Sequence, residues 1–236
     1  MRVEVISSVN EARADRFTHR TAIVIDVLRA TSTIVAALQA GSSGIYTVET
    51  VLDARALQRP ADLLAGERFC RKIPGFDLGN SPDEFTPEMV QDRRIILTTT
   101  NGTRGLHKAV RADHVLAGSL LNLSACTQAA LDLRRDIVLL CSGSHDEFAL
   151  EDGLCAGAFV AKLQAGSPDG LEMDDFAAAM LGFYRNSTGQ LYETLASGAT
   201  GRRLLKLGMA RDIKRCSQLD SSDIVARMQG GMLTRG

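Results

Sequence analysis

The sequence lacks the features that mark membrane, secreted or nucleic-acid-binding proteins. No stretch of its 236 residues approaches the roughly 18 consecutive apolar residues that a membrane span requires, and no apolar segment of signal-peptide length stands near the N-terminus. The formal net charge is −1, from 27 Lys and Arg against 28 Asp and Glu, so no overall charge draws the chain to nucleic acid or an anionic membrane. These absences predict a cytoplasmic protein without a nucleic-acid or membrane partner.

The cysteines show no pattern of pairing or metal ligation. Five of them are widely spaced along the chain, and no C-x-x-C occurs, which argues against a disulfide framework and a structural zinc site. The sequence therefore predicts free thiols in a reducing compartment, at Cys70, Cys126, Cys141, Cys155 and Cys216.

Several motifs of phosphate and nucleophile chemistry are also missing. No Gly-Lys pair exists, so the nucleotide P-loop is absent, and neither G-x-G-x-x-G, G-x-S-x-G nor His-Glu-x-x-His occurs. A two-aspartate phosphatase motif would need a second Asp two residues beyond Asp26, where Leu28 stands. None of the cysteines has an Arg six positions later, as a thiolate-phosphate loop would require.

What the chain does contain is an alternation of short apolar strands with segments of helical periodicity. This alternation predicts an α/β fold of three layers, α/β/α, with a mainly parallel sheet and a helical C-terminal portion, and we expect a single domain over residues 1–236. The predicted strands are Val3–Ile6, Ala22–Val27, Gly44–Val48, Ala61–Ala65, Ile95–Thr99, His114–Ala117 and Ile137–Cys141, with a further one near Ile224–Met228. The predicted helices are Thr31–Ala40, Leu52–Gln58, Thr103–Val110, Leu120–Leu133 and Asp152–Leu163, followed by a mostly helical stretch over 173–217 with breaks at Asn186–Ser187 and Ser197–Gly198.

Polar residues follow the predicted strand Ala22–Val27, at the end of a parallel strand where ligands collect in open sheets. A carboxylate such as Asp26 at that position is a common Mg²⁺ ligand, and Arg29 could grip a phosphate or carboxylate with two parallel hydrogen bonds. Thr31 and Ser32 would add hydroxyls and the free amides of a helix start. The alternative is that Asp26 satisfies local amides and a hydroxyl caps the helix.

A second polar turn follows the strand Ile95–Thr99 and precedes a helical segment. Asn101, Gly102, Thr103 and Arg104 occupy this turn, where Gly102 would let the backbone approach an anion and the helix start would favour phosphate. The competing interpretation is an ordinary capped connection between a strand and a helix.

Further acidic and amide side chains stand at other predicted strand ends and loops. Glu67 follows a strand and is a second candidate metal carboxylate. Asn80 and Ser81 lie in a long loop, where they are either ligands or turn residues. Glu151 and Asp152 begin a helix, so they either favour its dipole or take part in metal binding and base catalysis.

Taken in order, the motifs DVLRATST, LAGER, IPGFDLGNSP, TTTNGTR, AGSLLN and FALEDGLCAG resemble the Mg²⁺-dependent 2-phosphosulfolactate phosphatase family. The resemblance runs from about Ile23 to Gly157 and continues more weakly to Asp220. A Val-Pro pair typical of the family shortly after that position is replaced here by IVAR at residues 224–227. The resemblance implies an α/β/α fold and hydrolysis of a phosphate monoester carried on a sulfonated lactate.

The residues and the resemblance together predict one site. Mg²⁺ would lower the pKa of a bound water, and the neighbouring arginines and amides would stabilise charge on the phosphate. The predicted metal ligands are Asp26, Glu67 and Asp152. The predicted catalytic residues are Asp26, Arg29 and Glu151. The predicted substrate-binding residues are Thr31, Ser32, Asn80, Asn101, Gly102, Thr103 and Arg104.

Two other functions stay open from the sequence. The chain could hydrolyse a different small phosphorylated hydroxy acid on the same scaffold, or bind an anionic metabolite without catalysis. Direct attack by water and a phosphorylated Asp26 intermediate are both compatible with the sequence, and so is a homo-oligomer.

Overall fold

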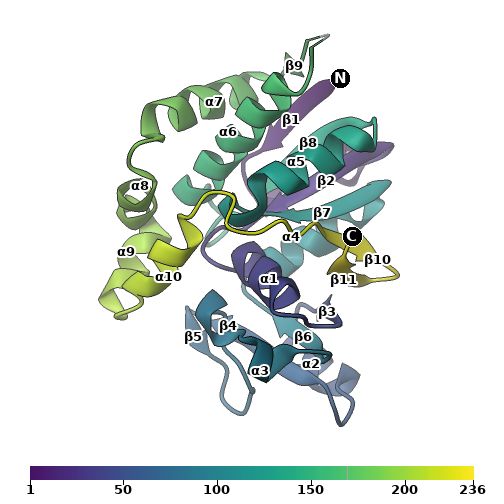
Figure 1. Cartoon of the computed structure of the whole chain (residues 1–236), viewed down its shortest axis with the longest axis vertical. Coiled ribbons are helices and arrows are strands. Elements are labelled where there is room, and N and C mark those ends of the chain that lie inside the picture. The colour runs from purple at the N-terminus through teal and green to yellow at the C-terminus, as the bar shows by residue number, and fades with distance from the viewer. Residues whose placement is uncertain (169) are drawn as a thin grey trace.

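The computed structural model describes residues 1–168 and 170–236, and these residues form one eleven-stranded sheet with helices on both faces (Figure 1). The strands are β1 (Arg2–Ile6), β2 (Arg20–Ile25), β3 (Gly44–Thr47), β4 (Leu63–Arg68), β5 (Arg71–Lys72), β6 (Arg94–Thr98), β7 (His114–Gly118), β8 (Asp136–Cys141), β9 (Glu172–Met173), β10 (Ala226–Gln229) and β11 (Met232–Arg235). The helices are α1 (Ala30–Gln39), α2 (Val51–Leu57), α3 (Pro87–Val90), α4 (Gly102–Lys108), α5 (Leu123–Asp132), α6 (Leu150–Ala165), α7 (Asp175–Ser187), α8 (Leu191–Ser197), α9 (Ala199–Lys206) and α10 (Ala210–Cys216). Short 3-10 turns are η1 (Val9–Glu11), η2 (Ala14–Arg16), η3 (Pro82–Glu84), η4 (Ala109–Arg111) and η5 (Leu120–Asn122).

The sheet consists of two parallel parts joined by the C-terminal hairpin. Strands β4, β6 and β3 pair in parallel, and so do β7, β2, β8, β1 and β9. Between them lie β10 and β11, of which β10 pairs antiparallel with β7 and β11 antiparallel with β3 (Figure 1). The prediction of a mainly parallel sheet is confirmed, and the last residues of the chain occupy its middle rather than its edge.

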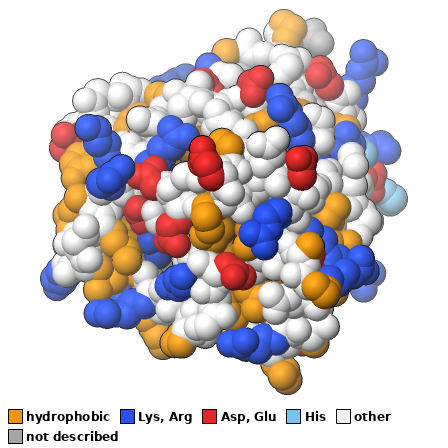
Figure 2. All heavy atoms as spheres, turned by 60° about the horizontal axis from the view of Figure 1, so that its bottom comes forward, with side chains coloured by type: hydrophobic (Ala, Val, Ile, Leu, Met, Phe, Trp, Pro, Cys, Tyr) orange, Lys and Arg blue, Asp and Glu red, His pale blue; other side chains and the backbone are white. Residues whose placement is uncertain are grey.

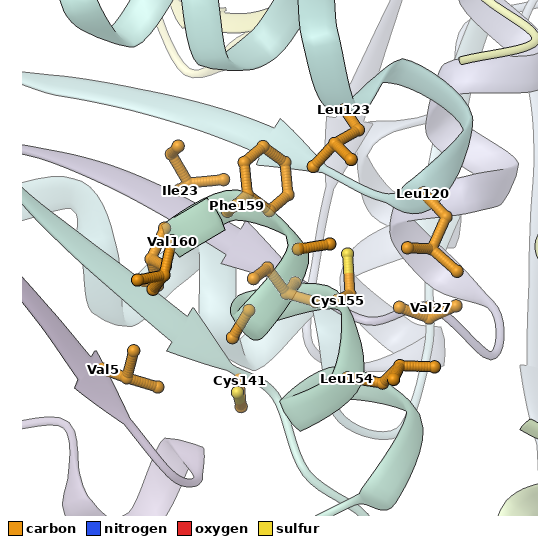
Figure 3. Close-up of a cluster of buried hydrophobic side chains, with 14 of the residues drawn as sticks. Val5, Ile23, Val27, Leu120, Leu123, Cys141, Leu154, Cys155, Phe159 and Val160 are labelled. Atoms are coloured by element: carbon orange, nitrogen blue, oxygen red, sulfur yellow. The ribbon is translucent and has the colours of Figure 1, made fainter. Parts of the chain in front are cut away.

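Helices cover both faces because alternate residues of the inner strands point to opposite sides. On one face Ile23 of β2 packs with Phe159 of α6 and Leu123 of α5, as Figure 3 shows. On the other face α4 approaches β2 closely, since a Cβ at Gly105 would lie 3.0 Å from a methyl group of Val24. The predicted three-layer α/β/α architecture is therefore confirmed.

The element boundaries differ from the sequence prediction mainly where two strands form a hairpin. Strand β4 begins two residues later than predicted and extends to Arg68, because its end pairs with β5 through Glu67 and Lys72. The strand expected near Ile224–Met228 is β10, and β11 after it was not predicted. The helical C-terminal portion is confirmed as α7 to α10, with helix ends at the two predicted breaks.

The surface carries both signs of charge. On the face drawn in Figure 2, basic and acidic side chains are interspersed among apolar ones, in keeping with the nearly equal numbers of basic and acidic residues. Within residues 1–168 and 170–236, no helix has the length and apolar character needed to cross a bilayer.

Candidate active site

Strand ends from both parallel parts of the sheet converge on one pocket of about 250 Å³. Asp26 follows β2 and Gly143 follows β8, whereas Glu67 lies in β4 and Thr100 follows β6. The structure therefore brings strand-end residues from both sides of the hairpin β10–β11 into one pocket.

Asp26 is the most strongly perturbed acid that lines this pocket. Its side chain is buried, and Oδ1 accepts a hydrogen bond from the Ala30 amide at 3.1 Å. Burial raises the pKa of Asp26 to about 7, and the negative charges of Glu67 and Glu151 act in the same direction. An added positive charge at this position would relieve the repulsion between these acids.

The second oxygen of Asp26, Oδ2, lies against the start of α4 at Gly102. The two can approach this closely because glycine has no Cβ. A Cβ at Gly102 would lie 2.6 Å from Asp26 Oδ2 and 2.4 Å from the Ala30 Cβ. The glycine that the sequence identified as a close-approach position therefore sets the distance between the carboxylate and α4.

Glu67 connects the β4–β5 turn to the loop after β6. Its Oε2 accepts the Cys70 amide at 2.7 Å, and Oε1 accepts both the amide and the hydroxyl of Thr100 at 2.9 Å. These contacts fix the carboxylate in the pocket wall, which a ligand-binding group needs.

Asn80 contributes a buried amide oxygen without a partner. The residue lines the pocket, and its Oδ1 forms no hydrogen bond within the described residues. The Thr33 hydroxyl donates to its backbone oxygen at 2.9 Å, which holds the loop in place. A buried acceptor left unpaired in this way is destabilising unless a ligand satisfies it.

Arg29 places a buried cation at the same pocket. Its Nη1 donates to Asp212 Oδ2 at 2.6 Å and its Nη2 to the Cys70 carbonyl at 3.0 Å. Ser81 in turn donates its hydroxyl to the other oxygen of Asp212 at 2.7 Å. The guanidinium is therefore oriented from three segments of the chain before any substrate binds.

Asp152 acts as a link between two strand ends. Its Oδ1 accepts the Val27 amide and its Oδ2 the Gly143 amide, both at 2.9 Å, and the residue is not among those lining the pocket. Burial raises the pKa of Asp152 well above its usual value, with the charges of Asp26 and Glu151 adding to the effect. The structure thus gives Asp152 a supporting position behind the site, and its role as a metal ligand stays a prediction.

Glu151 is not among the residues that line the pocket, but it interacts with Thr200, which is. The carboxyl group is buried and its Oε2 has no hydrogen-bond partner in the described part of the chain. Burial raises the pKa of Glu151, and hydrogen bonding from the Thr200 side chain opposes this shift. Thr200 itself lines the pocket, so the acid and the cavity are one side chain apart.

Three of the predicted substrate-binding hydroxyls donate to backbone oxygens, and their role in binding substrate stays a prediction. Thr31 donates to the Asp26 carbonyl at 2.9 Å, and Ser32 and Thr103 donate to the carbonyl oxygens five and four residues before them. They hold the strand–helix turns, whereas Asn101 from the same set does line the pocket.

Arg104 is not among the residues that line the pocket. Its guanidinium pairs with Asp146 at 2.9 Å and donates to Asn10 Oδ1 at 3.4 Å. A phosphate-binding role for Arg104 stays a prediction.

Ten of the fifteen lining residues were not among the predicted site residues, and they include Phe69, Cys70, His145, Thr200 and Arg203. Phe69 and Cys70 adopt positive φ values of 57° and 64° in the β4–β5 turn. This conformation is uncommon for these residue types, so the sequence did not predict it. Arg203 lies on α9, within the stretch where the family resemblance weakens.

The donor set of the pocket suits a magnesium ion. Among the described residues, no three His, Cys, Asp or Glu side chains are gathered closely enough to hold a metal unaided. Asp26 and Glu67 nevertheless offer two carboxylates, and Asn80 offers an unpaired amide oxygen. Mg²⁺ needs no more from a protein, because it keeps several waters and binds phosphate oxygens.

Comparison with known proteins gives a consistent result along the chain. A family model described as 2-phosphosulpholactate phosphatase matches residues 6–231. A protein of Caldanaerobacter subterraneus subsp. tengcongensis, named probable 2-phosphosulfolactate phosphatase, is 40% identical over 234 residues, which are 98% of this chain and 95% of that protein. A protein with the same name from Thermotoga maritima is 39% identical over 90% of this chain and 91% of its own length. Another from Clostridium novyi is 32% identical over 100% of both chains.

Proposed function

The chain belongs to the 2-phosphosulfolactate phosphatase family, and from this membership we propose that it is a Mg²⁺-dependent phosphoric monoester hydrolase acting on 2-phosphosulfolactate. The products would be sulfolactate and inorganic phosphate. The observation that carries the proposal is one pocket that combines a buried acidic pair, Asp26 and Glu67, with the cations Arg29 and Arg203. We also propose a cytoplasmic location, since the five cysteines are free thiols, as a reducing compartment favours.

The proposed metal ligands are Asp26, Glu67 and the amide oxygen of Asn80. When bound there, Mg²⁺ would neutralise phosphate oxygens and lower the pKa of a bound water. Burial and, after it, the negative charges of Glu67 and Glu151 raise the pKa of Asp26, and a bound cation would offset this cost of its charged form, which supports the assignment.

The remaining pocket residues would bind the substrate and handle protons. Arg29 is oriented by Asp212 and the Cys70 carbonyl, so its guanidinium would stabilise charge on the phosphate without first reorganising. Burial raises the pKa of Glu151, which suits a group that takes up or releases a proton during hydrolysis of the ester. Thr200, whose side chain hydrogen-bonds to that acid, lines the cavity.

A phosphate-release assay with and without metal tests the proposal. We expect release of phosphate from 2-phosphosulfolactate with Mg²⁺, loss of release in EDTA, and recovery when excess Mg²⁺ is restored. The panel should include the phosphate esters of lactate, glycolate and glycerate. If another ester is turned over faster, that ester replaces 2-phosphosulfolactate as the proposed substrate. Turnover that is unaffected by EDTA would contradict the proposed Mg²⁺ dependence. Saturable binding of these esters without any release would show a binding protein instead.

A further inference from the structure

Arg203 reaches the pocket from α9, far along the chain from the other charged groups. The helices α8, α9 and α10 follow one another along the left edge of the view in Figure 1. Arg203 is half-buried and shares the pocket lining with Asp26 and Arg29. The pocket therefore contains a second cation, Arg203, to which neither metal binding nor phosphate binding has been assigned.

The two arginines differ in how their charge is balanced. Arg29 is fully buried and its charge is compensated by Asp212, 2.6 Å away. Arg203 forms no ion pair with any residue in the described ranges. Its Nη1 lies 3.5 Å from His145 Nε2, and its other N–H groups remain available for an anion.

An aromatic side chain holds this guanidinium in place. The Arg203 Cζ lies 5.7 Å from the ring centroid of Phe69, which is 63% exposed. Phe69 sits in the β4–β5 turn with φ at 57°, and Glu67 fixes that turn by accepting the Cys70 amide. An exposed aromatic side chain on a constrained turn at a pocket is better explained by positioning Arg203 than by packing.

We propose that Arg203, held by Phe69 and His145, binds one of the two anionic groups of 2-phosphosulfolactate that are not hydrolysed, and that this group is the sulfonate rather than the carboxylate. The inference rests on the proposed function. Arg29 and the acidic pair occupy the buried part of the pocket, which leaves the half-buried Arg203 for the other end of a small acid. The planar guanidinium presents parallel N–H donors that match two sulfonate oxygens.

The first test compares two substrates that differ in the sulfonate. 2-Phospholactate keeps the phosphate and the carboxylate but has a methyl group in place of the sulfomethyl group. We expect Arg203→Gln to raise KM for 2-phosphosulfolactate roughly 10- to 100-fold, with little change in kcat, and to leave KM for 2-phospholactate almost unchanged. Equal losses on both substrates, or no loss on either, would overturn the inference.

Arg202→Gln is the matched control. Arg202 is the neighbouring residue on the same helix, it is exposed, and its guanidinium donates to the Ser197 carbonyl rather than lining the pocket. This variant should retain the wild-type KM for both substrates. Arg203→Lys keeps the positive charge but loses the parallel N–H donors of the guanidinium, so it should retain part of the affinity that Arg203→Gln loses. A thermal unfolding curve will show that each variant is folded.

A binding measurement separates this inference from the phosphatase assignment. Calorimetry with sulfolactate in EDTA involves neither metal nor turnover. We expect wild type and Arg202→Gln to bind it and Arg203→Gln to bind it at least about 10-fold more weakly. If no ester is hydrolysed but this dependence is found, the proposed function fails and the anion site stands. If esters are hydrolysed but sulfolactate binds Arg203→Gln as tightly as wild type, the inference fails alone.

Discussion

Arg29 Nη1 and Asp212 Oδ2 lie 2.6 Å apart in a buried ion pair, although the two residues are 183 positions apart in the sequence. Arg29 lines the pocket, and Asp212 stands behind it on α10. The pair joins the strand end that carries Asp26 to the helical C-terminal portion, so the position of a cation in the pocket depends on the last quarter of the chain.

Removing Asp212 should both destabilise the protein and impair the site. Asp212→Ala leaves a buried guanidinium without its counter-charge, which costs about 3 to 5 kcal/mol. We expect a lower free energy of unfolding in urea and a higher KM for the phosphorylated substrate. Ser81→Ala, which removes one hydrogen bond to Asp212, should cost at most about 3 kcal/mol. Equal stability of wild type and Asp212→Ala would contradict a structural role for the pair.

Asp26→Asn should abolish phosphate release without unfolding the protein. Asn keeps an oxygen that can accept the Ala30 amide but loses the charge proposed to bind Mg²⁺. The measurements are phosphate release at saturating Mg²⁺ and thermal unfolding in EDTA. A variant with full activity would remove Asp26 from the metal site.

The same variant tests the pH dependence of stability. In the metal-free protein burial raises the pKa of Asp26 from 3.8 to about 7, so between these pH values the folded state binds a proton that the unfolded chain does not. This stabilising contribution is complete below about pH 3.8 and is lost as the pH rises through about 7. We therefore expect the difference in unfolding temperature between wild type and Asp26→Asn, both measured in EDTA, to shift against wild type as the pH rises from 4 to 8. Parallel pH profiles of the two proteins would contradict the raised pKa.

Asp152→Asn separates a supporting role from direct metal ligation. One side-chain oxygen would be replaced by an NH₂ group facing the Val27 or Gly143 amide, so a buried donor would lose its acceptor. We expect a loss of about 1 to 3 kcal/mol in the free energy of unfolding in EDTA. Calorimetric titration with Mg²⁺ should show a smaller loss of affinity than Glu67→Gln. Unchanged stability with strongly weakened Mg²⁺ binding would identify Asp152 as a ligand after all.

Gly102→Ala should displace Asp26 from its position. The added methyl group would lie 2.6 Å from Asp26 Oδ2 and 2.4 Å from the Ala30 Cβ, so the carboxylate or α4 must shift. We expect a loss of about 1 to 3 kcal/mol in stability and a clear fall in kcat. Gly182→Ala in α7, where no atom lies within 4 Å of an added Cβ, is the control and should be neutral or stabilising by up to about 1 kcal/mol. Full activity of Gly102→Ala would show that the close approach is not needed.

The features of the fold that depend on local pattern could be predicted from the amino-acid sequence. Continuous apolar runs such as Ile137–Cys141 predict strands buried on both faces, and the alternation with helices predicts the layered architecture. The positions of Asp26, Glu67, Asn80 and Asn101 at strand ends and in loops were enough to group them, because strand ends in such folds form the ligand-binding edge.

Contacts between distant segments determine which of these groups are available and which further residues complete the site. Whether Asp152 and Arg104 face the pocket depends on amides and acids supplied by other segments, and the local sequence does not encode those partners. The insertion of β10 and β11 between β7 and β3, and the arrival of Asp212 and Arg203 from the C-terminal helices, arise from packing between elements far apart in the chain. Asp26, Glu67 and Arg29 could thus be predicted at the pocket from the sequence, whereas long-range packing brings Arg203 to it and places Asp212 beside Arg29.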